Sequence, residues 1–306
     1  HQSAVFLYNL SDPVNPFVTG KIDIYGYVGN IEVEGDLAFV ANGESGVSIF
    51  DLTDPAVPEQ IGSYPATGFV NNIWVDDSLL FIADRGDAHF GLMYGFKSGV
   101  PKKSYSGQSP LPGGLQILNV TDPVNPVPAG FYNFPYPASV TGVYTASNKV
   151  AGLNNTGLDP GLWLIEVSDT IAVYPCTTLS STRDAKSIGD ILYLATQSCL
   201  EIREFNSGLG LIGYYDIPDF GGLSIDVQDD YAYLGGTGGD VKIFNISDPA
   251  VPILAAEIPI IANATFVSAR GDYLYIAYFY YGPSGTTDVL IYDISDPENP
   301  DSVWAI

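Results

Sequence analysis

The feature that most constrains this chain is a sequence repeat in two parts. The first part is a short apolar pattern that follows a Gly-Asp or similar turn, as in GDLAFVA at residues 35–41. It returns as DSLLFIA (77–83), GDILYLA (189–195), DDYAYLG (229–235) and GDYLYIA (271–277), with a weak copy in SNKVAGL (147–153). Short apolar runs rich in aromatic and β-branched residues, bounded by turn residues, are typical of β-strands.

The second part of the repeat is an apolar run that ends in an Asp-Pro turn, as in SIFDLTDPAVP at residues 48–58. Its copies are FLYNLSDPVNP (6–16), QILNVTDPVNP (116–126), KIFNISDPAVP (242–252) and LIYDISDPENP (290–300), with degenerate copies LIEVSDT (164–170) and IREFNS (202–207). The two parts alternate in a fixed order at a spacing of about 40 residues, which is the length of one propeller blade.

Each repeat predicts four short strands. In the copy at residues 30–64 they are 31–34, 37–41, 47–51 and 58–64, with turns at Gly35-Asp36 and at Asp54-Pro55. A sheet of such short strands cannot bury both of its faces alone, but sheets packed face to face around an axis bury them and protect their edges. The sequence therefore predicts an all-β propeller of four-stranded blades.

Both motifs, the S/T-D-P-x-x-P turn and the G-D/N-x-A-Y/F-V-A strand before it, resemble the LVIVD repeat family. The resemblance covers nearly the whole chain. It implies a β-propeller with an extracellular or cell-surface location, and it implies no shared catalytic residues.

The number of blades is open at this stage. We expect one domain over residues 1–306, in which residues 1–26 provide only the third and fourth strands of a half blade and six complete repeats follow. Seven blades are favoured, and a closed six-blade ring with an extra docked hairpin is the alternative. The first two strands of the half blade would come from residues absent from this sequence or from another chain by strand addition. The expected partner is therefore a second copy or another surface protein.

Two loops depart from the repeat and are candidate interaction sites, because loops that interrupt a regular scaffold often carry function. The first is an insertion at 84–113 in the second repeat, and the second follows a strand of the last repeat. Their candidate residues are Arg85, His89, Tyr94, Phe96, Lys97, Lys102, Lys103 and Tyr105 in the first loop and Tyr278, Phe279, Tyr280 and Tyr281 in the second. The alternatives are a neutral insertion, and aromatic residues that complete a strand and pack inward.

Cys176 and Cys199 fall in neighbouring connections on one face of the predicted fold, so we expect a disulfide between them; two buried free thiols are the alternative. Candidate N-glycosylation sites are Asn9, Asn119, Asn154, Asn245 and Asn263. Three of these sequons occupy the same repeat position, where other copies have Asp or Glu. The alternative role of that residue is to cap the turn after the third strand.

The charge and the residue inventory argue against several functions. With 35 acidic and 11 basic residues, the net charge of −24 disfavours binding to nucleic acid, and no apolar run is long enough for membrane insertion. Only His1 and His89 could act as imidazole bases, and neither has a nucleophile motif nearby. The sequence predicts a noncatalytic propeller without a cofactor, acting in structural assembly or in surface recognition of a protein or glycan. Calcium binding by the acidic surface, and a polysaccharide lyase or glycoside hydrolase, remain alternatives.

Overall fold

The computed structural model describes most of the chain, in segments separated by gaps. These segments are residues 2–66, 68–85, 114–133, 140–146, 149–154, 161–166, 172–175, 182–206, 208–260, 262–279 and 287–305. Every regular element within them is a β-strand. The same segments contain no helix with the length and hydropathy that crossing a bilayer requires.

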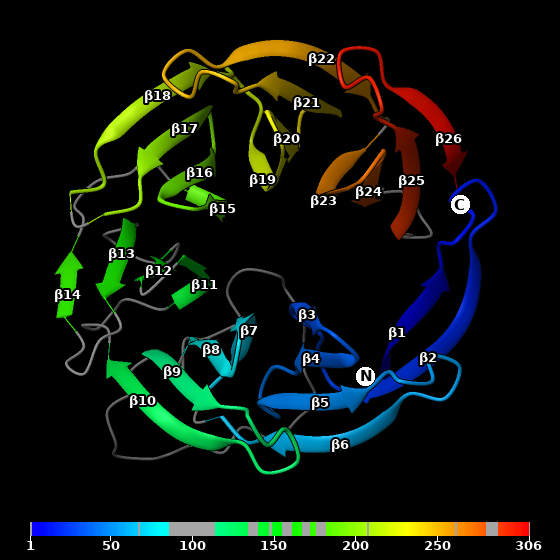
Figure 1. Cartoon of the computed structure of the whole chain (residues 1–306), viewed down its shortest axis with the longest axis vertical. Coiled ribbons are helices and arrows are strands. Elements are labelled where there is room, and N and C mark those ends of the chain that lie inside the picture. The colour runs from blue at the N-terminus through cyan, green and yellow to red at the C-terminus, as the bar shows by residue number, and fades with distance from the viewer. Residues whose placement is uncertain are drawn as a thin grey trace, which may run out of the picture. The chain divides into compact units, whose positions relative to one another are not determined.

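Within the described residues, the strands form one two-stranded sheet and six four-stranded sheets (Figure 1). The two-stranded sheet pairs β1 (Gln2–Asn9) with β2 (Phe17–Tyr25). Three four-stranded sheets are β3–β6 (Ile31–Glu34, Leu37–Ala41, Val47–Asp51, Glu59–Tyr64), β7–β10 (Val70–Asp76, Leu79–Asp84, Gly114–Asn119, Val127–Asn133) and β11–β14 (Val140–Ala146, Lys149–Asn154, Gly161–Glu166, Ala172–Pro175). The others are β15–β18 (Thr182–Ile188, Ile191–Thr196, Cys199–Glu204, Leu211–Asp216), β19–β22 (Gly222–Gln228, Tyr231–Gly236, Asp240–Asn245, Ile253–Pro259) and β23–β26 (Asn263–Arg270, Tyr273–Phe279, Thr287–Asp293, Asp301–Ala305). Each four-stranded sheet is one sequence repeat with its strands in chain order.

The turn between the first and second strands has one backbone conformation in five of the sheets. Its first residue has a positive φ between 52° and 58° in all five, at Gly35, Asp77, Gly189, Asp229 and Gly271. Glycine and aspartate are among the residues that tolerate this left-handed conformation. The acidic pairs at Asp76-Asp77 and Asp229-Asp230 are thus explained by turn geometry.

The Asp-Pro turn between the third and fourth strands is held by side-chain caps. In the first four-stranded sheet, Asp51 Oδ1 accepts the Thr53 N–H at 2.7 Å, and Asp54 Oδ1 accepts the Ala56 N–H at 3.0 Å. The same pair of bonds recurs at Asn119 with Asp122 and at Asn245 with Asp248. Such side-chain to backbone bonds are the reason that Asp and Asn favour turns, so the repeat motif encodes this turn directly.

The chain divides into two compact units. Unit 1 comprises residues 1–7, 20–143 and 156–159, and unit 2 comprises residues 8–19, 144–155 and 160–306. In unit 1, the buried Phe39 and Ile49 of the sheet β3–β6 pack with Ile73 and Leu80 of the sheet β7–β10. Apolar residues of β2 cover the other face of β3–β6.

Unit 2 has the same packing between successive sheets. One buried cluster joins Tyr193 and Leu200 of β15–β18 to Val227 and Leu234 of β19–β22. A second joins Tyr233 and other residues of β19–β22 to the sheet β23–β26. Each sheet therefore contributes one face to the core on either side of it, as a propeller blade does.

Side-chain oxygens also join the first strands of successive sheets. In unit 2, Asp184 Oδ2 of β15 accepts the N–H of Ile225 in β19 at 2.8 Å, and Ser224 Oγ of β19 accepts the N–H of Val267 in β23 at 3.2 Å. In unit 1, Asn72 Oδ1 of β7 accepts the N–H of Val143 in β11 at 3.0 Å. These acceptors occupy the same repeat position, so the link between sheets is itself repeated.

A buried carboxylate reinforces these links in unit 2. Asp226 of β19 has a side chain that is 5% exposed, and its Oδ2 accepts the N–H of Ala269 at 3.0 Å. The same carboxylate pairs with Arg270 Nη1 at 2.9 Å and with Lys186 Nζ at 3.1 Å. A single side chain thus connects the first strands of three sheets.

The predicted all-β propeller of four-stranded blades is confirmed. The described residues contain six four-stranded sheets and one two-stranded sheet, so the count of seven blades stays a prediction. The expectation of a single domain also stays a prediction.

Candidate interaction site

The hairpin β1–β2 occupies the place of the third and fourth strands of a blade next to the sheet β3–β6. A Cβ atom built on Gly20 of β2 would overlap the carbonyl oxygen of Pro55, in the Asp-Pro turn of that sheet. Gly62 of β6 has the same relation to Pro123 in the next sheet of unit 1. In both cases a fourth-strand glycine permits close approach of the following turn. The hairpin is therefore half of a blade by its packing as well as by its sequence.

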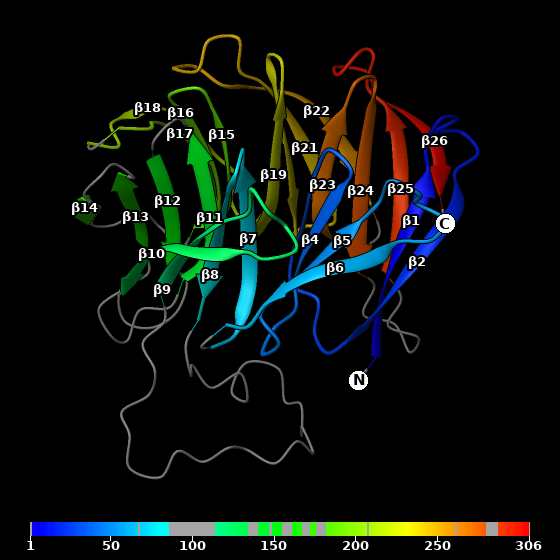
Figure 2. The ribbon, with the colours of Figure 1, turned by 60° about the horizontal axis from the view of Figure 1, so that its bottom comes forward.

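Strand β1 has one paired edge among the described strands. Every other described third strand pairs with a second strand on one side and a fourth strand on the other, whereas β1 pairs with β2 alone. Figures 1 and 2 show β1 and β2 side by side. The side of β1 where the repeat places a second strand is open within the described residues.

The side chains of β1 are correspondingly less buried than those of the other third strands. Leu7 is half-buried, and the neighbouring Phe6 is 53% exposed. The residues that match Leu7 in other sheets are at most 3% exposed: Ile49, Ile117, Ile202, Ile243 and Ile291. Because Leu7 has the same aliphatic character, its exposure follows from the edge of β1 that is open among the described strands.

A second exposed residue in unit 1 lies on the first strand of the following sheet. Val33 of β3 is 61% exposed, whereas the matching Val227 and Ala269 in unit 2 are 6% and 1% exposed. Val227 lies in one buried cluster with Tyr193, and Ala269 lies in one with Tyr233; both tyrosines belong to the second strand of the preceding sheet. Among the strands that the structure describes, the hairpin β1–β2 before β3 has no second strand that covers Val33 in this way.

The open edge of β1 lacks the usual protection against pairing. Its sequence, QSAVFLYN, contains no charged residue, proline or glycine. Exposed edge strands are usually blunted by charges, proline or bulges. The neighbouring β2 carries a charged pair, in which Lys21 Nζ lies 2.6 Å from Asp23 Oδ1 and 6.0 Å from the centre of the Phe6 ring. The chemistry of β1 therefore favours the addition of another strand.

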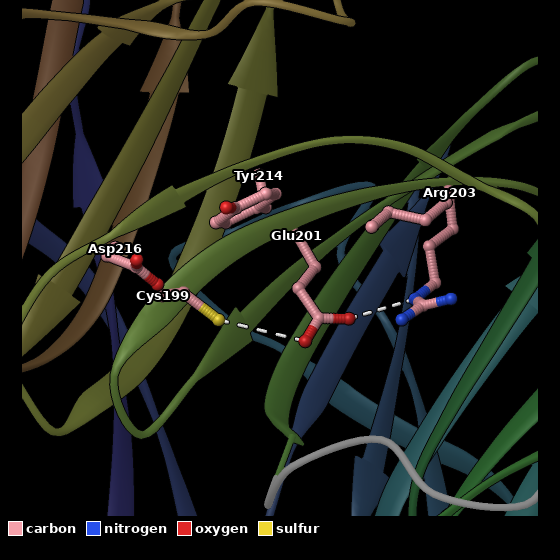
Figure 3. A pocket seen from close by; sticks show the side chains of 6 residues that line it. Cys199, Glu201, Arg203, Tyr214 and Asp216 are labelled. Carbon is pink, nitrogen blue, oxygen red and sulfur yellow. Dashed lines mark hydrogen bonds and ion pairs between the residues drawn. The ribbon is translucent and has the colours of Figure 1, made fainter.

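A pocket on the sheet β15–β18 is the second candidate site (Figure 3). It is lined by Cys199, Glu201, Arg203, Leu211, Tyr214 and Asp216. Glu201 Oε2 accepts the Arg203 Nε–H at 2.8 Å, which neutralises the carboxylate, and its Oε1 lies 3.7 Å from the Cys199 Sγ. Burial raises the pKa of the Cys199 thiol, with a smaller opposing effect from Thr196. A raised pKa disfavours the thiolate, which is the nucleophilic form of cysteine.

The two loops predicted as interaction sites lie largely outside the described residues. Strand β8 ends at Asp84 and β9 begins at Gly114, and the backbone N–H of Arg85 donates to the Phe69 carbonyl at 3.0 Å. The remaining candidates of the insertion are not described: His89, Tyr94, Phe96, Lys97, Lys102, Lys103 and Tyr105. Their role as contact residues stays a prediction.

The aromatic segment of the last repeat corrects one expectation. Tyr278 lies in β24, is 9% exposed and belongs to a buried cluster, so it packs inward instead of forming part of a surface loop. Phe279 is the last residue of the same strand. Tyr280 and Tyr281 lie outside the described residues.

Only one partner of the predicted Cys176–Cys199 disulfide lies among the described residues. Cys199 is a buried free thiol at the start of β17, with its Sγ 3.0 Å from Thr196 Oγ1. Cys176 lies outside the described residues, so the Cys176–Cys199 bond stays a prediction.

Three of the five sequon asparagines have a structural role in the Asp-Pro turn. The Oδ1 atoms of Asn9, Asn119 and Asn245 each accept the N–H of the residue two positions later, at 2.9–3.1 Å. Asn154 ends β12 and Asn263 begins β23. Turn capping accounts for the asparagine at the shared position, and glycosylation stays a prediction.

Comparison with known proteins supports the assignment of the fold. The LVIVD repeat model matches residues 25–66, 223–258 and 262–303, so these three segments are LVIVD repeats. These segments contain the sheet β3–β6, most of β19–β22 and nearly all of β23–β26. No curated protein matches the sequence.

Several solved structures resemble the chain at low sequence identity. The β-propeller domain of Cps50 (Swd1) from Myceliophteria thermophila is 13% identical with a TM-score of 0.65, covering 92% of this chain and 87% of that one. A putative 6-phosphogluconolactonase from Bacteroides fragilis is 11% identical with a TM-score of 0.69, covering 95% and 87%. The computationally designed Ika8 protein is 8% identical with a TM-score of 0.64, covering 95% and 77%. At these identities the similarity establishes the propeller fold alone.

Proposed function

We propose that this protein is a noncatalytic β-propeller of the extracellular space or cell surface, and that it acts in structural assembly or recognition by strand pairing at the open edge of β1. The observation that carries the proposal is the state of β1. It has the sequence and the packing of a third strand, yet within the described residues no second strand pairs with it, as one does beside each residue that matches Leu7. Unpaired main-chain groups along such an edge are a template for an added strand.

The register of the other sheets identifies the main-chain groups that would bind an added strand. In the sheet β3–β6, the Leu52 N–H donates to the Asp36 carbonyl at 2.7 Å, so alternate residues back along β5 direct their N–H groups toward β4. Ser48 is one of these residues, and Phe6 occupies its place in β1. The Phe6 N–H therefore points to the open side, away from β2.

The high negative charge of the chain predicts how association of copies depends on salt. Two copies with a net charge of −24 repel each other over a distance that salt shortens. Because β1 itself is uncharged, pairing at this edge gains main-chain bonds and apolar contact without a direct charge clash. Association of copies should therefore increase with ionic strength.

The experiment is to measure the size of the purified chain by mass photometry and electron microscopy across concentration and salt. The test variant is Phe6→Pro, which removes the N–H directed to the open edge, and the matched control is Phe6→Ala, which removes the ring but keeps the N–H. We expect regular assemblies of the parent chain and of Phe6→Ala at high salt, and isolated particles of Phe6→Pro. Equal assembly by Phe6→Pro would show that the edge is not the contact.

The noncatalytic part of the proposal is tested separately. It is supported by the described pocket, where burial raises the pKa of the Cys199 thiol and Arg203 pairs with the Glu201 carboxylate. Incubation of the chain with a panel of acidic and neutral polysaccharides should release no reducing ends or unsaturated products. Turnover of any of them by the purified chain, lost on unfolding, would overturn this part.

A further inference from the structure

We infer that the partner at the open edge is a two-stranded β-hairpin with the chemistry of the first and second strands of this protein's own four-stranded sheets, such as β19 and β20. It carries an aromatic residue that packs on Val33. The inference rests on the proposed function and specifies its partner. One strand of the hairpin pairs with β1 and contains an aromatic residue, an aliphatic residue and then Ala or Gly. The other strand pairs with the far side of that strand, as the first strand of a blade does.

The width of the exposed surface calls for more than a single extended peptide. Leu7 and Phe6 lie on β1, the third strand of the half blade, whereas Val33 lies on the first strand of the next sheet. An added strand beside β1 would supply the main-chain bonds. Elsewhere in the chain each second strand is itself paired with a first strand on its far side. A hairpin of two strands would complete the four-stranded blade.

The need for an aromatic residue follows from the packing between complete blades. Tyr193 shares a buried cluster with Val227 of the following sheet, and Tyr233 shares one with Ala269. Val227 and Ala269 occupy the repeat position of Val33. An aromatic ring in the middle of the added strand would therefore cover Val33, and it would bury apolar surface that is exposed at present.

The same position is aromatic in five of this chain's own second strands. The residues are Phe39, Phe81, Tyr193, Tyr233 and Tyr275. Two positions further along, each of these strands has a small residue: Ala41, Ala83, Ala195, Gly235 or Ala277. At Gly235 the reason is visible, because an added Cβ would lie 2.8 Å from the Ala264 carbonyl oxygen and 3.1 Å from Val267 Cγ1 of the following sheet. A bulky residue there would be excluded from the added strand as well.

The face that receives the hairpin is continuous with an existing core. Ile22 and Ile24 of β2 are buried with Val40 and Phe50 of the sheet β3–β6, and Leu7 packs at the border of this cluster. A hairpin at the open edge would extend the cluster from Leu7 toward Val33. It would replace solvent with the contacts that complete blades have, in the way that strand-donating partners complete an unfinished sheet.

The experiment uses the intact chain and a labelled synthetic peptide with the sequence of residues 222–236, which contains β19, its turn and β20. Fluorescence anisotropy at low chain concentration measures binding. Two matched peptides carry single changes: one has Tyr233→Ala, and the other has Gly235→Leu. Matched chains carry Val33→Asp, or Phe6→Pro with Phe6→Ala as its control.

We expect saturable binding that weakens at least about tenfold when the tyrosine is replaced, since this loses a buried aromatic side chain. The Leu peptide and the Val33→Asp chain should bind about tenfold less well too, and Phe6→Pro should not bind. Assembly of the chain that depends on Phe6, combined with equal affinity for the tyrosine and alanine peptides, would overturn this inference and leave the proposed function standing. Peptide binding that Phe6→Pro and Val33→Asp leave unchanged would place the peptide elsewhere and overturn it too. If the parent chain neither assembles nor binds the peptide, the proposed function and this inference are both overturned.

Discussion

Replacing Asp226 with alanine tests whether first-strand side chains hold the sheets of unit 2 together. The carboxylate is 5% exposed, accepts the Ala269 N–H at 3.0 Å and pairs with Arg270 and Lys186 at 2.9 and 3.1 Å. Removing one partner of a buried ion pair costs about 3–5 kcal/mol, because the remaining groups lose their compensation. The Arg270 side chain is 65% exposed, so water screens its share. We therefore expect a loss at the lower end, about 3 kcal/mol.

This loss is large enough to measure in a chain of 306 residues. An unfolding entropy of about 2 cal/mol/K per residue converts it to a fall in Tm of roughly 5 °C. Thermal and urea denaturation followed by fluorescence would measure it. The control is Asp23→Ala, which breaks an ion pair of 2.6 Å between side chains that are 45% and 50% exposed, and should cost under about 0.5 kcal/mol. Equal stability of the two variants would refute the claim that Asp226 links the sheets.

Three further predictions concern the repeat itself. Gly62→Ala should lower the free energy of unfolding in urea by about 2 kcal/mol, because the added Cβ overlaps the neighbouring turn. The control Ala256→Gly, at the matching position, should cost under about 1 kcal/mol. An unchanged stability of Gly62→Ala would refute the close packing. Hydrogen bonds from the threonine two residues later lower the pKa of Asp51, so its stabilising effect is present above the ordinary value of 3.8 and is lost as the pH falls through the lower folded value. Asp51→Asn keeps the cap without titrating, and its urea midpoint should fall less than the parent's on acidification; parallel curves would contradict this. In a Cys176→Ser chain, burial should make Cys199 react with iodoacetamide at least about tenfold more slowly than in urea, and equal rates would show an accessible thiol.

The strands were predictable from the sequence because each repeat carries its own turn chemistry. The predicted strands at 31–34, 37–41 and 47–51 are those of the structure, and the fourth begins one residue later than predicted, at Glu59. Pro58 precedes it and cannot donate a hydrogen bond to the ladder. Local residues decide where these elements begin and end, so a reading of local pattern finds them.

The side-chain links between sheets were not predictable in the same way. The position of Asp226 is occupied by Glu32, Trp74, Lys186 and Ser268 in other repeats, so the repeat does not specify a carboxylate there. The ion pairs arise from what the adjacent sheets present. The sequence of a single repeat therefore does not predict these ion pairs.

The exposed surface beside β1 was predictable from the sequence only in part. The sequence predicted a half blade at residues 1–26, and the structure places a two-stranded sheet there. The exposure of Val33 was missed, because valine at that position fits the apolar pattern of a buried strand. Val33 is identified by comparison with Val227 and Ala269, each of which follows a complete four-stranded sheet.

Hydrogen–deuterium exchange of β1 tests the central claim most directly. In the isolated chain at low concentration, amides of β1 that face the open side, such as that of Phe6, should exchange at least about a hundredfold faster than the matching amides of β5. Under conditions of assembly, the same β1 amides should become protected while those of β5 do not change. Protection of β1 equal to that of β5 in the isolated chain would mean that the edge is already paired, and would contradict the account.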